Sequence, residues 1–442
     1  MPILGKRFDQ SFHRLGPGLR RILGNMGWLM VDRVVRLGLN LVIGIWIARY
    51  LGPQLFGSLN FALAYITLFS AVTSLGLESI VIREILAHPE DTQEILGTTL
   101  LLRFAGGLLG IATSLATLRL IQPHDKQAQL LVSILSLNLL FQAFDTIDCF
   151  FQSQVRSRIT VWAKNLAFLL FAAVRIALIH IKAPLWTFAA ANTGEIALGA
   201  VGLILGYRFS GGRLLSWKPY KARATSLLQQ SWPVLVSGMA VMVYMRLDMV
   251  MLKVMRGDFE VGLYSAATRV SEVWYFVPAA IVSSVSPAIL RVKDDPELFL
   301  RRMRKLFSLM TLMACVIGSV IALASHTIVR LLYSASYSGA DSILAVHVWA
   351  SIFVFLGLAQ SPWDLARDLL RLSLYRTIAG AIINIAINLI LIPAHGAMGA
   401  AIATVVAYAI SAVFANAFHP KTRAVFILQM RSFLPTKFWQ LT

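Results

Sequence analysis

The sequence predicts an all-α polytopic membrane protein, with twelve transmembrane helices in two pseudo-repeated six-helix bundles around a central cavity. Three features predict this fold: long uncharged segments, an uneven distribution of basic residues and a weak internal repeat. Between Arg49 and Glu78, 28 consecutive residues carry no charge, and a membrane-spanning helix needs about 20 apolar residues. Such segments are too long for barrel strands of roughly 10 residues, and an open sheet edge cannot be satisfied in hydrocarbon.

Twelve apolar segments meet the length requirement, and short connections join them. Hydrophobic residues make up 57% of the chain and charged residues only 14%, as expected for a chain that lies mostly in lipid. The approximate cores of the predicted spans are 26–48, 55–77, 95–118, 127–150, 158–180, 184–207, 226–252, 262–289, 305–332, 341–363, 375–393 and 396–418.

The net charge of +19 could indicate nucleic-acid binding or the charge bias of a membrane protein. The positions of the basic residues distinguish the two. When alternate connections are assigned to opposite sides, 27 of the 40 basic residues fall on one side, 7 on the other and 6 within spans. Basic connections stay in the cytoplasm, which predicts an inner-membrane protein with both termini cytoplasmic and therefore an even number of spans. A nucleic-acid partner is not needed to explain the charge.

The longest connection, near Gly211, Gly212 and Pro219, separates two halves of the chain. Residues 1–25 have no apolar core of a secretory signal, so they are expected to remain in the mature protein. The predicted organisation is a basic cytoplasmic N-terminus at 1–25, an N-terminal six-helix bundle at 26–208, a cytoplasmic linker at 209–224, a C-terminal six-helix bundle at 225–419 and a cytoplasmic tail at 420–442.

The two halves resemble each other at an offset of 205 residues. In the first half, Leu51-Gly52-Pro53 leads into Phe56-Gly57, and in the second half Arg256-Gly257-Asp258 leads into Val261-Gly262. Two similar halves in a membrane protein indicate a transporter whose site lies between them.

Several motifs resemble those of bacterial polysaccharide-biosynthesis membrane proteins of the O-antigen flippase type, over about residues 24–418. The motifs are Arg49-x-Leu51-Gly52-Pro53-x-x-Phe56-Gly57, Leu75-Gly76-Leu77, Val81-x-Arg83-Glu84, Arg246-x-Asp248, Val261-Gly262-x-Tyr264-Ser265-Ala266-Ala267, Pro278, Ser286-Pro287 and Leu391-Ile392-Pro393-x-x-Gly396-x-x-Gly399-Ala400-Ala401-x-Ala403-Thr404.

This resemblance implies a superfamily that comprises multidrug exporters, oligosaccharide-lipid flippases and lipid II flippases. It implies two V-shaped bundles that work by alternating access. Lipid II flippases of that superfamily usually carry two further spans, which this sequence lacks, so the oligosaccharide-lipid branch fits better.

Six arginines lie inside the predicted spans, where each costs roughly 2.5–3.5 kcal/mol unless it faces protein or water. They are the candidate substrate-binding residues, and they are Arg33, Arg36, Arg103, Arg175, Arg246 and Arg269. The alternative for each is a structural ion pair, or a side chain that reaches the interface. Together they outnumber the acids nearby, and the guanidinium group binds phosphate bidentately. A cationic cavity would therefore suit the diphosphate of a lipid-linked glycan.

Acids and amides in the spans supply further candidates. The acids could couple transport to an ion or pair with the arginines, and they are Asp32, Asp145, Asp148, Asp248 and Glu272. The amides could bind sugar hydroxyls or join neighbouring helices, and they are Asn138, Gln142, Asn384 and Asn388. The histidines are scattered singly, and Cys149 and Cys315 both lie in spans. We therefore expect no metal, disulfide or cofactor.

The predicted function is translocation of a polyprenyl-diphosphate-linked oligosaccharide across the bacterial inner membrane for surface polysaccharide biosynthesis. The expected partners are this substrate, membrane lipids, and a polysaccharide polymerase with other assembly proteins. One alternative is a cation-coupled multidrug exporter, which would favour an acidic cavity. Another is an integral-membrane glycan polymerase or ligase, which would need a large outer loop that the sequence lacks. We therefore do not expect an enzyme.

Overall fold

The computed structural model describes residues 17–433, with side chains from residue 35 onward. Every regular element in residues 17–433 is a helix, and no strand occurs there. The all-α prediction is confirmed. Helices follow from the sequence because, in hydrocarbon, each backbone N–H and C=O group needs a partner within its own segment.

The N-terminal half of the chain runs through α9. Its elements are α2 (Pro17–Ser74), α3 (Glu78–Ala87), η1 (Pro89–Asp91), α4 (Thr92–Ile121), α5 (Lys126–Ser136), α6 (Asn138–Phe141), η2 (Gln142–Phe144), α7 (Asp145–Ser153), α8 (Arg158–His180) and α9 (Leu185–Phe209). The predicted fourth span is divided into α5, α6, η2 and α7, and its polar residues lie near these breaks.

The C-terminal half begins after a short 3₁₀ turn. Its elements are η3 (Leu214–Ser216), α10 (Lys221–Arg256), α11 (Asp258–Glu272), η4 (Val273–Tyr275), α12 (Phe276–Leu290), α13 (Pro296–Leu332), η5 (Ala335–Tyr337), α14 (Ala340–His347), α15 (Ala350–Ala366), α16 (Leu370–Ala412), η6 (Phe414–Ala417) and α17 (Arg423–Ser432). Asp295 caps the N-terminus of α13. Its carboxylate accepts a hydrogen bond from the Leu298 N–H at 3.1 Å, which satisfies one of the free donors of the first turn.

Ten helical segments of the described chain are long and apolar enough to cross a membrane. Two of them, Val35–Ala87 with 53 residues and Leu370–Ala417 with 48, are far too long for one passage, because about 20 residues span the hydrocarbon. Both bend at a glycine with positive φ, Gly52 (69°) and Gly396 (55°). Each bend lies at the junction of two predicted spans, so the ten segments accommodate twelve passages.

The internal repeat appears as a reciprocal contact between α2 and α11. A Cβ atom on Gly57 would lie 1.8 Å from the Asp258 carbonyl oxygen, and one on Gly262 would lie 2.0 Å from the Pro53 carbonyl oxygen. Only glycine permits this approach. Gly52 and Gly257, which precede these contacts, share an unusual backbone conformation with φ of 69° and 88°.

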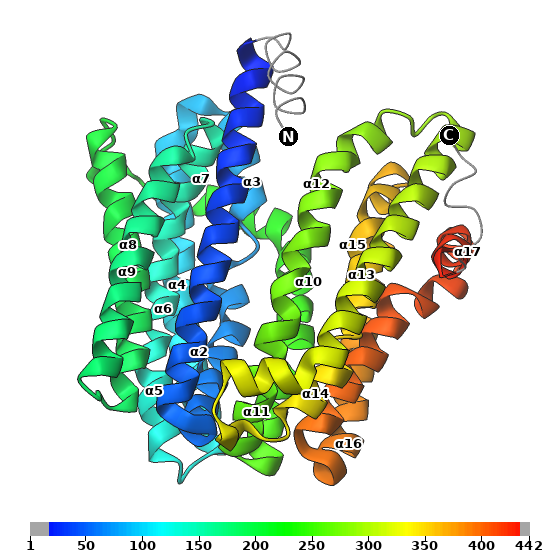
Figure 1. Cartoon of the computed structure of the whole chain (residues 1–442). Coiled ribbons are helices and arrows are strands. Elements are labelled where there is room, and N and C mark those ends of the chain that lie inside the picture. Colours follow the sequence, from blue (N-terminus) through cyan, green and yellow to red (C-terminus); the bar gives the residue numbers. More distant parts are fainter. Residues whose placement is uncertain (1–16, 434–442) are drawn as a thin grey trace, which may run out of the picture.

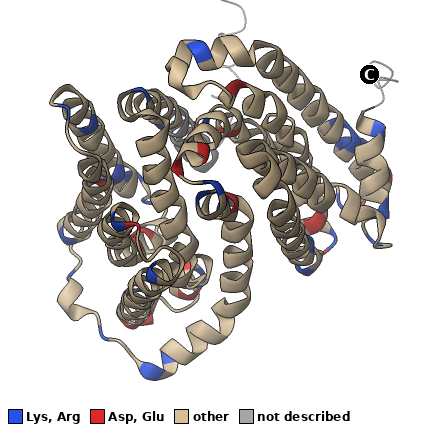
Figure 2. Ribbon diagram, turned by 90° about the horizontal axis from the view of Figure 1, so that it is seen from below, with Lys and Arg blue, Asp and Glu red and all other residues tan. Residues whose placement is uncertain are grey.

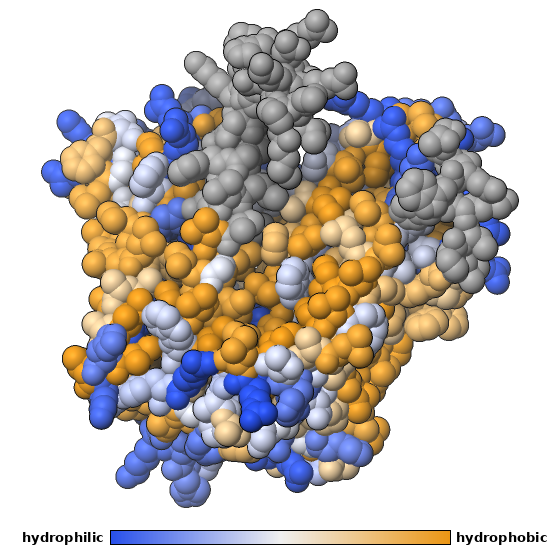
Figure 3. All heavy atoms as spheres, viewed as in Figure 1, coloured by the Kyte–Doolittle hydropathy of each residue, from blue (hydrophilic) through white to orange (hydrophobic). Residues whose placement is uncertain are grey.

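The two bundles converge at one end and diverge at the other (Figure 1). Helices α2, α11 and α14 lie together at the convergent end, whereas α12 packs on α13 and α15 of its own half. We call these the closed end and the open end. On the face shown in Figure 3, apolar side chains form a belt between hydrophilic side chains at the two ends. This belt has the pattern of a surface that faces lipid.

Polar contacts join the two halves at the closed end. The Arg49 guanidinium donates to the Leu332 carbonyl oxygen at 2.7 Å, and also to that of Leu331. The hydroxyl of Tyr337 donates to the Ala48 carbonyl oxygen at 2.8 Å. Arg49 thus binds free carbonyl groups at the C-terminus of α13, where the helix dipole favours a cation.

The predicted linker, residues 209–224, packs on the N-terminal half. Trp217 is buried, and its indole N–H donates to the Tyr207 hydroxyl at 2.9 Å. Arg223 pairs with Glu84, Asp91 and Glu94 of the N-terminal half. The start of α10 is therefore held by the first bundle, while its later part contacts α16 of the second.

Candidate functional site

Arg269 of α11 reaches across the boundary between the two halves. Its guanidinium donates to the Asn60 side-chain oxygen at 3.3 Å and lies 5.3 Å from the centre of the Phe56 ring, within the range of a cation–π contact. A Cβ atom on Gly44 would collide with it at 1.5 Å. The absence of side chains on Gly44 creates the space that Arg269 fills.

Arg246 of α10 lies in the same region. Its guanidinium is 3.9 Å from the Glu272 carboxylate, and the two side chains are 32% and 26% exposed. Arg269 interacts electrostatically with both Arg246 and Glu272. Arg246 therefore pairs with Glu272, and Arg269 lies within electrostatic range of both, next to the boundary between the bundles. We call Arg246, Arg269 and Glu272 the cationic cluster.

Asp248 lies two residues beyond Arg246 but points into the C-terminal bundle. It is 5% exposed, accepts a hydrogen bond from the Tyr264 hydroxyl and accepts one from the Met249 N–H at 2.7 Å. Tyr264 also lies 3.3 Å from the Thr404 hydroxyl. This carboxylate is satisfied by neutral donors, so it does not neutralise the cationic cluster through a direct pair.

Asn384 and Asn388 are buried in α16 at 1% and 0% exposure. The Asn388 amide donates to the Asn384 oxygen at 3.0 Å, while the Asn384 amide nitrogen and the Asn388 oxygen have no partner among the described residues. Nearby in the same bundle, His347 is bonded to Ser271 at 2.8 Å. In this conformation these two amides do not line an open cavity.

Arg36 and Arg175 both bind Glu195 in the N-terminal bundle, at 3.4 Å and 2.7 Å. The Arg36 guanidinium also lies 5.0 Å from the centre of the Phe168 ring. Arg36 is 36% exposed and Arg175 only 10%. The structure therefore groups these two arginines around an acid of α9, separately from Arg246 and Arg269.

Arg103 is isolated within the N-terminal bundle. It is 3% exposed, and its closest polar partner is the Cys149 sulfur at 3.9 Å. Its Nε has no partner among the described residues. The side chains of Asp32 and Arg33 lie outside the described residues, although both positions belong to α2.

Asp145 and Asp148 pair with Lys164, at 2.9 Å and 2.8 Å. Lys164 lies in the second turn of α8, which begins at Arg158. The Asn138 side-chain amide donates to the Asn192 side-chain oxygen in α9 at 3.0 Å. This hydrogen bond joins two helices, which is the alternative to a sugar contact for Asn138. Gln142 lies in η2 and is partly exposed.

Sequence analysis did not identify the ion pair at the closed end. Lys253 of α10 is 7% exposed and binds Asp125 of the N-terminal half at 2.7 Å, as well as Asp258 of its own half. Burial raises the pKa of Asp125, but hydrogen bonds from the Ala128 N–H and Lys253 outweigh it and hold this pKa below its ordinary value of 3.8. The carboxylate is therefore charged at neutral pH, and the pair is lost only in strong acid. Lys253 lies one residue beyond the predicted span at 226–252, so its burial was not expected.

Charged positions lie inside the bundles as well as on their rims (Figure 2). One group in the described chain has the spacing of metal ligands, namely His88 and Glu90, which are exposed, and Asp91, which is partly exposed. Asp91 is already bound by Arg223, and His88 lies 3.7 Å from Glu90. Each residue of this group therefore has a partner within the protein.

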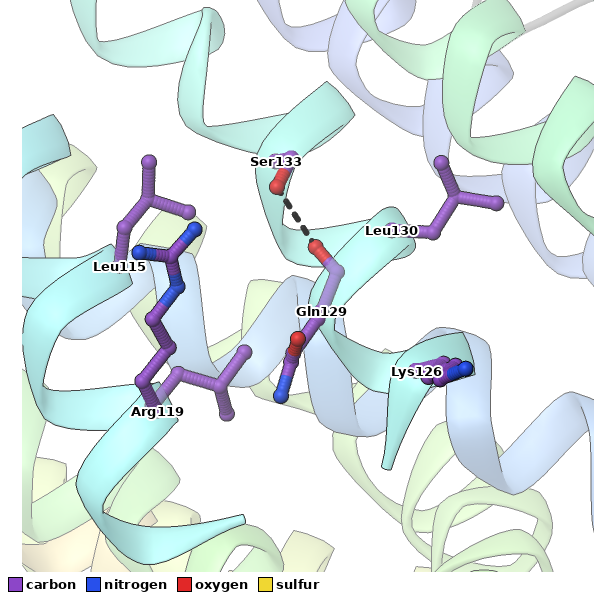
Figure 4. A pocket seen from close by; sticks show the side chains of 7 residues that line it. Leu115, Arg119, Lys126, Gln129, Leu130 and Ser133 are labelled. Carbon is purple, nitrogen blue, oxygen red and sulfur yellow. Dashed lines mark hydrogen bonds between the residues drawn. The ribbon is translucent and has the colours of Figure 1, made fainter. Parts of the chain in front are cut away.

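A cavity of about 240 Å³ lies between the last turns of α4 and the first turns of α5. It is lined by Leu115, Leu118, Arg119, Lys126, Gln129, Leu130 and Ser133, and Figure 4 shows the Arg119 and Gln129 side chains on either side of it. None of the sequence-predicted site residues lines it. This cavity belongs to one bundle and is separate from the cationic cluster.

Glu195→Gln should destabilise the protein by about 3 kcal/mol, because it leaves two arginines without their acid. The matched control is Glu297→Gln, an exposed position in the first turn of α13, which should be neutral. Thermal unfolding of the two purified variants in detergent would check this. Equal unfolding temperatures would mean that Arg36 and Arg175 do not depend on Glu195.

Among solved structures, three of the similar chains are transporters. An inward-facing multidrug resistance MATE family transporter of the MOP superfamily has a TM-score of 0.68 at 16% identity, over 90% of this chain and 94% of that chain. Lipid II flippase MurJ in an inward closed conformation has a TM-score of 0.67 at 15% identity, over 91% and 90%. An outward-facing MATE family transporter has a TM-score of 0.60 at 16% identity, over 95% and 96%.

At this low identity the similarity establishes a shared fold, and it confirms the prediction of two helical bundles arranged as in this superfamily. No curated protein sequence matches the chain significantly. Residues 22–293, more than half of the chain, match the family of polysaccharide biosynthesis proteins. The chain therefore belongs to the polysaccharide biosynthesis protein family.

Proposed function

We propose that the protein is a flippase that moves polyprenyl-diphosphate-linked oligosaccharide across the bacterial inner membrane, for biosynthesis of surface polysaccharide such as the O-antigen of lipopolysaccharide. The observation that carries the proposal is the cationic cluster, in which Arg246 pairs with Glu272 and Arg269 interacts electrostatically with both. The cluster has one positive charge in excess beside the boundary between the halves. A diphosphate would neutralise it.

Arginine suits this role because its planar fork donates two parallel hydrogen bonds to phosphate. Arg246 remains 32% exposed, so a headgroup can reach it. We place Arg36, which is 36% exposed, along the same route, and keep Arg33 as a candidate beside it. Arg103 and Arg175 are more deeply buried, so they would contact substrate only in another conformation.

The polar candidates have different positions with respect to the substrate. Gln142 is partly exposed and is our first choice for a sugar contact. Asn138, Asn384 and Asn388 are buried and would become available only when the helices rearrange. Asp248 and Glu272 are our candidates for coupling transport to an ion, and Asp32, whose side chain lies outside the described residues, is kept as a third candidate. Asp145 and Asp148 are already paired with Lys164.

The cluster also weighs against the alternatives. A multidrug exporter shares this fold, but cationic drugs would be repelled by an excess of arginine. An integral-membrane polymerase or ligase would need catalytic groups on a large outer connection, and the turn between α4 and α5, for example, is only residues 122–125. In our proposal the protein breaks no bond. A polysaccharide polymerase and other assembly proteins would act on the translocated substrate.

We infer that the open end faces the cytoplasm. The predicted linker lies at the same end as the start of α2, and the connections assigned to that side hold 27 of the 40 basic residues. The higher TM-score with the inward-facing than with the outward-facing MATE transporter, 0.68 against 0.60, agrees with this orientation. The closed end, with Lys253 and Asp125, would then face outward.

Labelling of introduced cysteines should confirm the orientation. In a variant without Cys149 and Cys315, Leu215→Cys in the linker should not react with an impermeant thiol reagent added to intact cells. His124→Cys, between α4 and α5, should react under the same conditions. Both positions are exposed, so membrane sidedness decides the result. Reaction at residue 215 in intact cells would reverse the proposed orientation.

Arg246→Lys should reduce glycan export about tenfold, because it keeps the charge but loses the bidentate hydrogen bonds to phosphate. Export is measured as glycan at the surface of a null strain, normalised to the amount of protein in the membrane. The matched control is Arg301→Lys at an exposed position of α13, which should export normally. Normal export by Arg246→Lys would show that this residue only balances Glu272.

A further inference from the structure

The last described helix, α17, differs in direction from the membrane helices. Figure 1 shows it nearly end-on at the edge of the C-terminal bundle, where it packs against α13. We had predicted residues 420–442 as a cytoplasmic tail. In the described part of this segment the structure has a helix of 10 residues, Arg423–Ser432, packed against α13.

A buried polar network fixes α17 to the bundle. The Asn416 amide donates to the Gln360 oxygen at 2.8 Å and to the Gln429 oxygen at 3.1 Å. Arg376 donates to the Asn416 oxygen, and to Asp364 at 2.6 Å. Gln360, Asn416 and Gln429 are at most 2% exposed. Because these polar groups satisfy one another away from water, α17 has a defined position.

The opposite face of α17 is exposed and both apolar and basic. Arg423, Ile427 and Arg431 are four residues apart, so they form one stripe along the helix, and all three are exposed. Ile427 is 43% exposed, while Phe418 before the helix and Phe433 after it are 88% and 40% exposed. A substantial part of the apolar area of these three side chains is thus left uncovered by the described chain.

The charge of this surface is not balanced locally. Lys421 is exposed beside the helix, and the sequence has no Asp or Glu after Asp368. No described acid lies within ion-pair distance of Lys421, Arg423 or Arg431, since none of the observed ion pairs includes them. The surface therefore combines unpaired cations with exposed aliphatic and aromatic side chains.

We propose that the exposed face of α17, with Lys421 and Phe418, is a docking surface for anionic lipid headgroups. A helix that lies in the membrane plane buries apolar side chains at the boundary between headgroups and acyl chains, while its cations meet lipid phosphates. Such clusters strengthen binding to anionic lipid with each basic residue. Since the buried network joins α17 to α15 and α16, bound lipid would fix the position of the C-terminal bundle at the membrane surface. This inference does not depend on the identity of the transported substrate.

The test is a titration of the full-length protein in neutral detergent with short-chain phosphatidylglycerol, followed by native mass spectrometry. The variant is Lys421→Gln/Arg423→Gln/Arg431→Gln. Its affinity for phosphatidylglycerol should fall at least about tenfold, and its weak binding of phosphatidylcholine should not change. The matched control is Arg208→Gln/Arg213→Gln/Lys218→Gln, which removes three exposed cations near the linker and should change the affinity less than about twofold.

A second variant tests the apolar part of the surface. Phe418→Ser/Ile427→Ser keeps every charge and should also weaken phosphatidylglycerol binding, because the acyl chains lose their contact. All variants should keep the wild-type unfolding temperature, since the buried network is unchanged. Equal losses for the α17 and linker variants, or no loss for the α17 variant, would overturn the proposal. Either result would leave the flippase proposal standing.

Discussion

The rest of the structure depends on the reciprocal approach of α2 and α11, where Gly57 meets the Asp258 carbonyl and Gly262 meets the Pro53 carbonyl. Because each glycine admits the backbone of the other half, the two bundles touch closely at one end. The Lys253–Asp125 pair and the hydrogen bonds of Arg49 and Tyr337 surround this contact. A transporter that alternates access must separate these groups. The contact therefore has to be close enough to seal the closed end, yet small enough to reopen.

The cost of burying charge explains why most charged side chains inside the bundles have polar partners. Glu195 serves two arginines, Lys164 serves two aspartates, and Asp248 is satisfied by neutral donors. Most charges inside the bundles are thus compensated, as hydrocarbon requires. Arg246 and Arg269 differ from Arg36 and Arg175, which share Glu195 in the same ratio, because Arg246 and Arg269 lie next to the boundary between the halves. In our account the missing negative charge is supplied by the substrate.

Much of the fold could be predicted from the sequence, because uncharged segments of about 20 residues have one stable solution in lipid. The repeat at Gly52 and Gly257 also predicted where the halves correspond. The site was harder to predict. Sequence spacing indicates neighbours on one helix only, so it could not pair Arg175 with Glu195 or Lys253 with Asp125. Lys253 lies just beyond the predicted span at 226–252, where a lysine usually reaches the interface, so its burial could not be predicted. The helix α17 was missed because a segment of 10 residues is too short to span a membrane.

The central claim is that the closed end must open during transport. The most direct measurement uses Asp125→Cys/Lys253→Cys in a protein without Cys149 and Cys315, treated with a short impermeant bismaleimide in intact cells. Cross-linked protein should stop delivering newly made glycan to the surface, whereas each single-cysteine variant treated in the same way should continue. Complete cross-linking with undiminished export would contradict the account, because the two bundles would then transport without separating at this end.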